Sequence, residues 1–189
     1  MNDFHQRTLA LFEVIHPLDR IARAGFVLRG VAEPESVAAH SHFVAVLTLL
    51  FIKQYPDRYD AGKALAMALL HDLCEARLMD IPMPVLDTGL KEAKEQAEQV
   101  IDKALFEGLP GDLAAITAEA AEGKTPEARL VRGLDKAQMM VKVVLYQREN
   151  RGRLDEFWAN PKNFADYGLP EVSGFFDAIC AWAGKTRPK

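Results

Sequence analysis

The sequence predicts a single all-α domain, and three observations support that fold class. The chain has 189 residues, enough for one domain with a sizeable hydrophobic core. Apolar residues recur at helical spacing along most of the chain, and almost no segment resembles a strand. No internal repeat, low-complexity segment or linker divides the sequence. We therefore expect residues 1–189 to form one helical bundle.

The predicted helices follow one another along the whole chain. In order they cover about residues 3–15, 18–29, 36–53, 61–76, 89–107, 112–121, 127–149 and 170–183. Pro17 ends the first helix, and the second is a short amphipathic stretch. Ser36 is a good N-cap for the long apolar third helix, and Asp60 can cap the fourth after a turn at 55–60.

Helix-breaking residues separate the later helices. Pro-Met-Pro at 82–84 predicts a loop over residues 77–88. Gly-Leu-Pro-Gly at 108–111 divides a charged helix from a short one, and Pro-Lys-Asn at 161–163 and Gly168 precede the last helix. The expected single domain has a core at about 18–150, a C-terminal helix at about 170–183 and a short, frayed basic tail at 184–189.

Charge and composition exclude several classes of protein. A formal net charge of −4 without a basic stripe argues against a dedicated nucleic-acid binder. The N-terminus has no apolar leader behind a basic start, and no segment approaches the roughly 18 apolar residues of a membrane span. Cys74 and Cys180 lie far apart and form no CxxC pair, so a reduced protein is the simplest interpretation, with one disulfide as the alternative. We expect a soluble, cytoplasmic protein.

The adjacent residues His71 and Asp72 are the most informative chemical feature. They end an apolar run at 64–70, so polar groups stand where a buried helix face is expected to continue. Burying a carboxylate is costly unless it is paired or binds a metal. Imidazole and carboxylate are common ligands of divalent transition metals. His40 and Asp135, on other predicted helices, are the candidate partners.

His40, rather than His42, is expected to face the interior. Two positions along a helix rotate the side chain by about 200°, so these two histidines cannot share one face. His40 lies about one turn after Ser36, among inward-facing positions, and Asp135 lies next to an apolar face of its helix. Taken singly, each residue has a simpler interpretation, namely a core histidine or a surface or capping aspartate.

Several motifs together make the sequence similar to a known family. They are Arg-Ala-Gly-Phe-Val-Leu-Arg at 23–29, Pro-Glu-Ser-Val-Ala-Ala-His at 34–40, His-Asp-Leu-Cys-Glu-Ala-Arg-Leu-Met-Asp at 71–80 and Leu-Asp-Lys-Ala-Gln at 134–138. In order and separation they resemble the HD-domain metal-dependent phosphohydrolases, and more closely the branch that contains the bacterial 5′-deoxynucleotidases. The resemblance implies an HD-type helical bundle.

The resemblance also implies roles for single residues. The residues that match the family's metal ligands are His40, His71, Asp72 and Asp135. Glu75 and Asp80 match acidic residues that act beside the metal, and Arg23 matches a substrate-contacting arginine. One divalent transition metal, whether Co, Mn, Fe, Ni or Zn, is expected. A second metal needs additional histidines, and only His5, His16 and His42 remain.

Glu75 and Asp80 have a physical interpretation as well. Glu75 follows His71 by four positions, so a continuous helix places both on one face about a turn apart. Either carboxylate can take a proton or orient the nucleophile, and the sequence does not assign the two roles. The alternatives are a solvated helix face or a partner for Arg77 in the case of Glu75, and an N-cap or turn for Asp80. Met79 stands where close relatives often have glycine, so a shift of its loop is expected.

Basic residues are candidate phosphate ligands. Arg23 and Arg29 can clamp a phosphate group, because a guanidinium binds two of its oxygens at once. Lys136, next to Asp135 in the sequence, can neutralise phosphate charge. The alternatives are a surface arginine at position 29 and a solvent-facing lysine at position 136.

Together these features predict a phosphoric monoester hydrolase with deoxyribonucleoside 5′-monophosphates as the expected substrates. The alternatives are an HD hydrolase of another nucleotide or phosphorylated metabolite, and a non-catalytic helical regulatory module with a structural metal. The stretch at 139–146 is more apolar than one buried face requires. We expect it to supply core plus a subunit interface, consistent with the homodimers that the resemblance implies.

Overall fold

The computed structural model describes residues 3–188, apart from the side chains of residues 84, 86 and 87. It confirms the all-α prediction, because β pairing among these residues is limited to one isolated antiparallel bridge between Ala22 and Ser36. The longer helices are α1 (Asp3–Ile15), α3 (Val37–Gln54), α4 (Ala61–Leu70), α7 (Lys91–Leu105), α8 (Leu113–Glu122), α9 (Pro126–Arg148) and α11 (Pro170–Ala183). The shorter ones are η1 (His16–Asp19), α2 (Ala24–Val27), α5 (Glu75–Leu78), α6 (Met83–Val85), η2 (Leu86–Leu90), α10 (Asp155–Ala159) and η3 (Pro161–Phe164).

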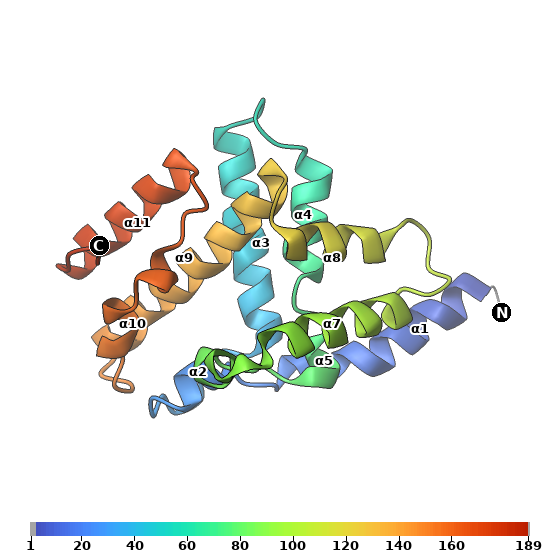
Figure 1. Ribbon diagram of the computed structural model, residues 1–189, viewed down its shortest axis with the longest axis horizontal. Helices are drawn as coiled ribbons and strands as arrows, with labels where there is room; N and C mark the ends of the chain where they lie inside the picture. Colours follow the sequence, from blue (N-terminus) through green and yellow to red (C-terminus); the bar gives the residue numbers. More distant parts are fainter. Residues whose placement is uncertain (1–2, 189) are drawn as a thin grey trace.

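Three helices form the centre of the molecule (Figure 1). Helices α3 and α4 pack together as a hairpin, α9 packs across both, and α11 covers the other side of α9. The hydroxyl of Ser36 accepts a hydrogen bond from the Ala39 amide at the start of α3, and the carboxylate of Asp60 accepts one from the Lys63 amide at the start of α4. Both predicted N-caps are confirmed, and each satisfies an amide that the helix itself leaves unpaired.

Helix α9 contributes most to the core. Its residues Leu130, Leu134, Met140 and Val143 are completely buried. The subunit interface predicted for residues 139–146 stays a prediction, but none of these residues is exposed and the stretch supplies core, as expected. The reason is that α3 and α11 cover α9 from two sides, and an apolar stretch wider than one face is needed to pack against both.

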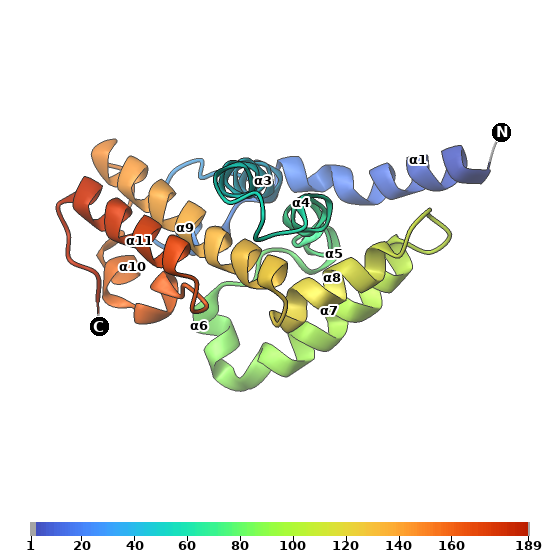
Figure 2. The same cartoon turned by 90° about the horizontal axis from the view of Figure 1, so that it is seen from above.

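Helix α1 lies at the edge of the bundle. Figure 2 shows it extending away from the central helices on the side of α4 and α5. It buries none of its residues and contacts η1 and α5. Arg7 donates a hydrogen bond to the carbonyl of Glu107, 3.1 Å away, and so connects α1 to the end of α7. Helix α7 packs on α8, which in turn packs on α4 and α9.

Several predicted boundaries are wrong. The helix expected at 61–76 ends at Leu70, because the following amides bond to carbonyls three residues back and form tight turns before α5. The stretch at 18–29 is not one helix: η1 ends at Asp19, a short segment around the bridge between Ala22 and Ser36 interrupts it, and α2 follows. The loop expected at 77–88 contains α6 and the start of η2, and α10 was not predicted.

The C-terminal residues are attached to the domain rather than frayed. Arg187 donates hydrogen bonds to the Ser173 hydroxyl at 2.8 Å and to the Phe164 carbonyl at 2.6 Å. Lys189 lies outside the described residues. Cys74 and Cys180 are both buried and free, so they form no disulfide with each other.

Helix α3 is, by length and apolar composition, the one described helix that meets the requirements for crossing a membrane. The expectation that no segment approaches such a length is therefore corrected. In this structure α3 packs against α4 and α9 and buries Val37, His40 and Val44, as the core helix of a globular domain does.

Candidate metal centre and active site

Helix α3 places His40 at the centre of the molecule. This residue is completely buried, whereas His42 is exposed, as predicted. Its Nδ1 atom lies 2.7 Å from Oε1 of Gln138, and Nε2 of the same amide donates a hydrogen bond to Glu35 at 2.9 Å. Because the amide oxygen faces the ring, Nδ1 of His40 is the donor of this bond. The Nε2 atom of His40 is left to face the carboxylates of Asp72 and Asp135.

His71 is oriented in the same way at the end of α4. Its Nδ1 lies 3.0 Å from the carbonyl oxygen of Ala68, which can only accept. Its Nε2 lies 3.3 Å from Oδ2 of Asp72, and that oxygen lies 3.7 Å from Nε2 of His40. One potential ligand atom from each of these three residues lies within 4.8 Å of the other two.

Asp135 reaches the cluster from α9. Its Oδ1 lies 3.1 Å from Nε2 of His40, and its Oδ2 lies 3.6 Å from Nζ of Lys136. Burial acts to raise the pKa of Asp135, but the charge of Lys136 and the contact with His40 hold it well below its usual range. Helices α3 and α9 and the turn after α4 thus bring together all the residues predicted as metal ligands: His40, His71, Asp72 and Asp135.

This donor set fits a divalent transition metal. Two ligands that each bind an ion at about 2.1 Å lie roughly 3–3.5 Å from one another. The distances of 3.1 Å from His40 to Asp135 and 3.3 Å from His71 to Asp72 agree with that spacing. The Nε2 atoms of both histidines are buried without a hydrogen-bond partner, which protein interiors rarely tolerate. An ion bound between the imidazoles and the carboxylates satisfies both nitrogens.

The carboxylates around His40 attract any cation. Burial and the charge of Arg23 act to lower the pKa of His40, but the close carboxylates of Asp135 and Glu35 raise it to about 9. A proton and a metal ion compete for the same Nε2 atom, because a ligating imidazole must be neutral there. The buried cluster therefore favours a cation, and a metal ion can take the place of the proton.

Arg23 lies beside the cluster among carboxylates. The distances from its Nη1 atom are 3.6 Å to Asp72, 3.9 Å to Glu75 and 3.5 Å to Asp80. Its backbone amide donates to the carbonyl of Glu35 at 3.1 Å, next to the bridge between Ala22 and Ser36. This pairing fastens the extended segment before α2 to the start of α3, and it explains how a residue far from His40 in the sequence reaches the site.

Glu75 is buried at the site, although the reason given for its position is wrong. A turn separates it from His71, and it begins α5 instead of continuing α4. It is only 4% exposed, which excludes a solvated helix face, and its Oε2 atom has no hydrogen-bond partner. Burial, together with the negative charges of Asp72 and Asp80, raises the pKa of Glu75. Such a carboxyl group is suited to exchange a proton.

Asp80 is held more firmly than Glu75. Its Oδ2 atom accepts a hydrogen bond from the backbone amide of Ala24 at 2.6 Å, so it caps α2 instead of the chain that follows it. Met79 adopts φ 66° and ψ 167°, a conformation that favours glycine. The turn therefore keeps Asp80 beside Arg23 in spite of the side chain at position 79, and the local strain is concentrated at Met79.

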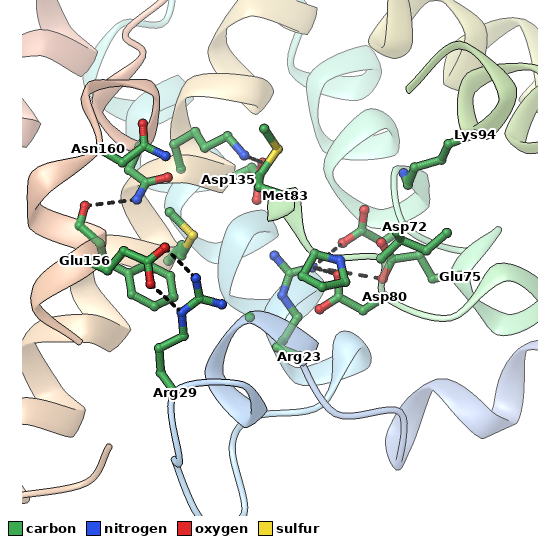
Figure 3. A pocket seen from close by; sticks show the side chains of 17 residues that line it. Arg23, Arg29, Asp72, Glu75, Asp80, Met83, Lys94, Asp135, Glu156 and Asn160 are labelled. Atoms are coloured by element: carbon green, nitrogen blue, oxygen red, sulfur yellow. Dashed lines mark hydrogen bonds and ion pairs between the residues drawn. The ribbon is translucent and has the colours of Figure 1, made fainter. Parts of the chain in front are cut away.

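The cluster opens into a cavity of about 270 Å³ (Figure 3). Its wall includes Asp72, Glu75 and Lys94 at one end and Glu156 and Asn160 at the other. Arg29 and Lys136 also line it. Nε and Nη2 of Arg29 donate hydrogen bonds to Glu156, at 3.1 Å and 2.7 Å. Because Lys136 lines the cavity, the alternative of a solvent-facing lysine is not supported. Arg29 also lines the cavity, but its guanidinium is already hydrogen-bonded to a carboxylate.

Sequence reasoning assigned no role to Glu35, Gln138 or Lys94. Glu35 and Gln138 stand inside two of the motifs, and Gln138 follows Asp135 by three positions, on the same face of a helix. That spacing was a usable signal for a residue that supports the ligands. Lys94 had no such signal, because it is one of several lysines in a highly charged helix.

A family model described as the HD domain matches residues 15–172 of this sequence. The chain belongs to the HD-domain family. The fold prediction of an HD-type helical bundle is thereby confirmed, since the match covers α3, α4 and α9 with every residue of the cluster.

Curated relatives and a solved structure agree with this assignment. The chain is 31% identical over 156 residues to the 5′-deoxynucleotidase HDDC2 of Mus musculus, a match that covers 79% of this chain and 76% of the mouse protein. It is 32% identical over 182 residues to a 5′-deoxynucleotidase of Saccharomyces cerevisiae, covering 92% and 71% of the two chains. The crystal structure of the PH0347 protein from Pyrococcus horikoshii OT3 is similar at a TM-score of 0.73 and 32% identity, covering 93% of this chain and 98% of that one.

Proposed function

We propose that this HD-domain protein is a metal-dependent phosphohydrolase that removes phosphate from deoxyribonucleoside 5′-monophosphates. The observation that carries the proposal is the pair of buried, unpartnered Nε2 atoms of His40 and His71 beside two carboxylates at the end of a cavity. The names of the mouse and yeast relatives, both 5′-deoxynucleotidases, support the substrate class.

The proposed cofactor is one divalent transition metal, either Co, Mn, Fe, Ni or Zn. Its ligands are His40, His71, Asp72 and Asp135, whose donor types suit these ions. When bound, such an ion lowers the pKa of a water molecule and polarises a phosphoryl oxygen. Gln138 holds the ring of His40 in the orientation that ligation needs.

The two further carboxylates have different proposed roles. Glu75 is the residue that exchanges a proton, because its Oε2 atom is buried without a hydrogen-bond partner and its raised pKa lets the carboxyl hold a proton at neutral pH. Asp80 is a positioning residue, since its carboxylate already binds the Ala24 amide and the guanidinium of Arg23. The unpaired Glu75 also argues against a regulatory module with a purely structural metal, which has no use for a spare buried carboxylate.

The proposed phosphate ligands are Arg23 and Lys136. Both line the metal end of the cavity, and both carry a positive charge beside the metal-binding carboxylates. Arg29 has a smaller proposed part, because Glu156 already accepts hydrogen bonds from its Nε and Nη2 atoms.

The nucleoside is proposed to lie towards the opposite wall of the cavity. Met139, Phe157 and Asn160 line that wall, and they offer an apolar surface, an aromatic ring and an amide. These groups suit a base and a sugar better than they suit a second phosphate.

A substrate panel tests the proposed activity. Purified protein is loaded with Co²⁺, Mn²⁺ or Mg²⁺ and assayed for phosphate release from deoxyribonucleotides, ribonucleotides and sugar phosphates. We expect the highest kcat/KM for deoxyribonucleoside 5′-monophosphates. Release from another phosphomonoester alone would favour the alternative hydrolase specificity. No release from any of them in a metal-loaded protein would favour the regulatory module.

We also propose that the protein is cytoplasmic, binds no nucleic acid and forms a homodimer. Two free, buried cysteines and a net charge of −4 support the first two proposals.

For the homodimer, the outer face of α3 exposes the apolar side chains of Phe43, Val46, Leu49 and Leu50. The helix carries no Asp, Glu, Lys or Arg before Lys53, so a second copy of the same face is its best partner. Leu50→Glu should convert the dimer to a monomer in light scattering, and a monomeric wild type would contradict the proposal.

A further inference from the structure

Lys94 is a cation of the cavity that the roles above do not use. Helix α7 carries two lysine–glutamate pairs of the same spacing, Lys91 with Glu95 and Lys94 with Glu98. The side chain of Lys91 is 71% exposed, whereas that of Lys94 is 18% exposed and lines the cavity together with Glu75. One pair is therefore in solvent, and the other is turned towards the site.

The ammonium group of Lys94 faces the catalytic carboxylates. Figure 3 shows the amine end of Lys94 directed towards Asp72 and Glu75, with Arg23 on the far side of them in this view. Burial acts to lower the pKa of Lys94, but its pair with Glu98 and the charge of Glu75 more than offset this effect. The side chain therefore brings a full positive charge to the metal end of the cavity.

Lys94 also has hydrogen-bonding capacity to spare. An ammonium group has three donors, and the contact with Glu98 accounts for one of them. Arg29, by contrast, gives hydrogen bonds from two of its nitrogens to Glu156. A cation held inside a cavity by one partner, with its other donors unassigned, is suited to bind an anionic ligand.

We propose that Lys94 binds the phosphate of the substrate, donating to a non-bridging oxygen from the α7 side of the cavity, and that Glu98 is a positioning residue that holds it there. This inference rests on the proposed function, because it takes the ligand to be a phosphomonoester. It adds a third basic residue to Arg23 and Lys136.

Charge balance explains why the site needs this residue. Four carboxylates surround the place where the phosphate must bind, namely Asp72, Glu75, Asp80 and Asp135. Even when the charges of one divalent ion, Arg23 and Lys136 are counted, a bound phosphate dianion leaves this end of the cavity with excess negative charge. Fixed cations in a partly water-excluded site are the strongest means of compensating this excess charge.

The test compares Lys94→Met with the matched control Lys91→Met, one turn away in the exposed pair. The affinity of each metal-loaded protein for inorganic phosphate is measured by calorimetry, together with KM and kcat for a deoxyribonucleoside monophosphate. We expect Lys94→Met to weaken phosphate binding about tenfold or more and to raise KM, because a charge-assisted hydrogen bond is lost. Lys91→Met should change neither, and Lys94→Arg should restore most of the affinity.

Metal content and melting temperature are recorded for every variant, and Lys94→Gln replaces Lys94→Met if the latter does not fold. Unchanged phosphate affinity in a folded, metal-loaded variant without the lysine charge would overturn the proposal and leave Lys94–Glu98 as a structural pair. Phosphate binding is measured without turnover. A wild type that binds phosphate through Lys94 but hydrolyses no nucleotide would therefore contradict only the proposed function.

Discussion

At the scale of single residues, the chemistry of the cluster follows from how each ring is fixed. His40 and His71 are each held by a hydrogen bond at Nδ1, to Gln138 and to the Ala68 carbonyl, so both Nε2 atoms point at the carboxylates. The residue types predicted the cluster, because few side chains bind transition metals. The bonds that orient the rings could not be predicted, since one of them involves a backbone carbonyl and the other depends on how α3 meets α9.

Gln138 gives the most direct test of this orientation. Gln138→Leu removes the acceptor for His40 and leaves Glu35 without its amide donor. We expect metal affinity to fall about 10–100-fold, as for other residues that orient a metal ligand. Competition with a chromophoric chelator measures it. Gln54→Leu, at the exposed end of α3, is the control and should bind metal like the wild type; equal affinity in both variants would contradict the assigned role.

Met79 provides a test of strain beside the site. Its positive φ is a conformation that costs a non-glycine residue about 1–3 kcal/mol. Met79→Gly should relieve the strain and raise the free energy of unfolding by about 1 kcal/mol, after the greater flexibility of glycine in the unfolded chain is counted. Denaturant unfolding measures the change. Met83→Gly, in the helical turn α6, should instead be destabilising, and a loss of stability in both variants would refute the account.

At the scale of elements, most helix starts and ends were legible in the sequence, and the end of α4 was not. Ser36 and Asp60 mark the starts of α3 and α4, because a cap needs one side chain at one position. The end of α4 at Leu70 has no proline or glycine to mark it. The tight turn that follows is stabilised by the site itself, where Asp72 approaches both histidines. Tertiary contacts therefore override a local pattern that favours a continuous helix.

The close packing of α9 on α11 gives a test at this scale. A Cβ atom added at Gly133 would lie 2.8 Å from Cγ1 of Val172, whereas one added at Gly174 meets nothing within 4 Å. Gly133→Ala should lower the free energy of unfolding by about 1–3 kcal/mol, because the two helices must move apart. Gly174→Ala should raise it by up to about 1 kcal/mol through helix propensity. If denaturant unfolding showed that both substitutions raise the free energy of unfolding equally, α9 and α11 would not approach each other so closely at Gly133.

At the scale of the whole molecule, the fold assembles one site from segments that are distant in the chain. The extended segment before α2, the start of α3, the turn after α4 and the middle of α9 each contribute side chains to one cavity. Family motifs identified these segments, because they contain the ligands themselves. The wall formed by Glu156, Phe157 and Asn160 could not be predicted in this way, since it depends on how α10 and η3 fold back over the core.

In this assembly, different residues serve the proposed metal binding and the proposed reaction step, so single substitutions can test the two separately. Asp72 lies within reach of both histidines, so it belongs to the proposed metal centre. Oε2 of Glu75 lies 3.9 Å from Nη1 of Arg23 and is buried without a hydrogen-bond partner, so Glu75 belongs to the proposed chemistry. Replacing one residue should remove the ion, and replacing the other should leave the ion in place.

The most direct test measures metal content and phosphate release from a deoxyribonucleoside 5′-monophosphate in wild type, Asp72→Ala and Glu75→Gln. We predict that Asp72→Ala loses both the metal and the activity. Glu75→Gln should keep the metal and lose about 100-fold or more in kcat, as expected when a group that exchanges a proton in the reaction is removed. Phosphate release by an Asp72→Ala protein that contains no metal would contradict the account.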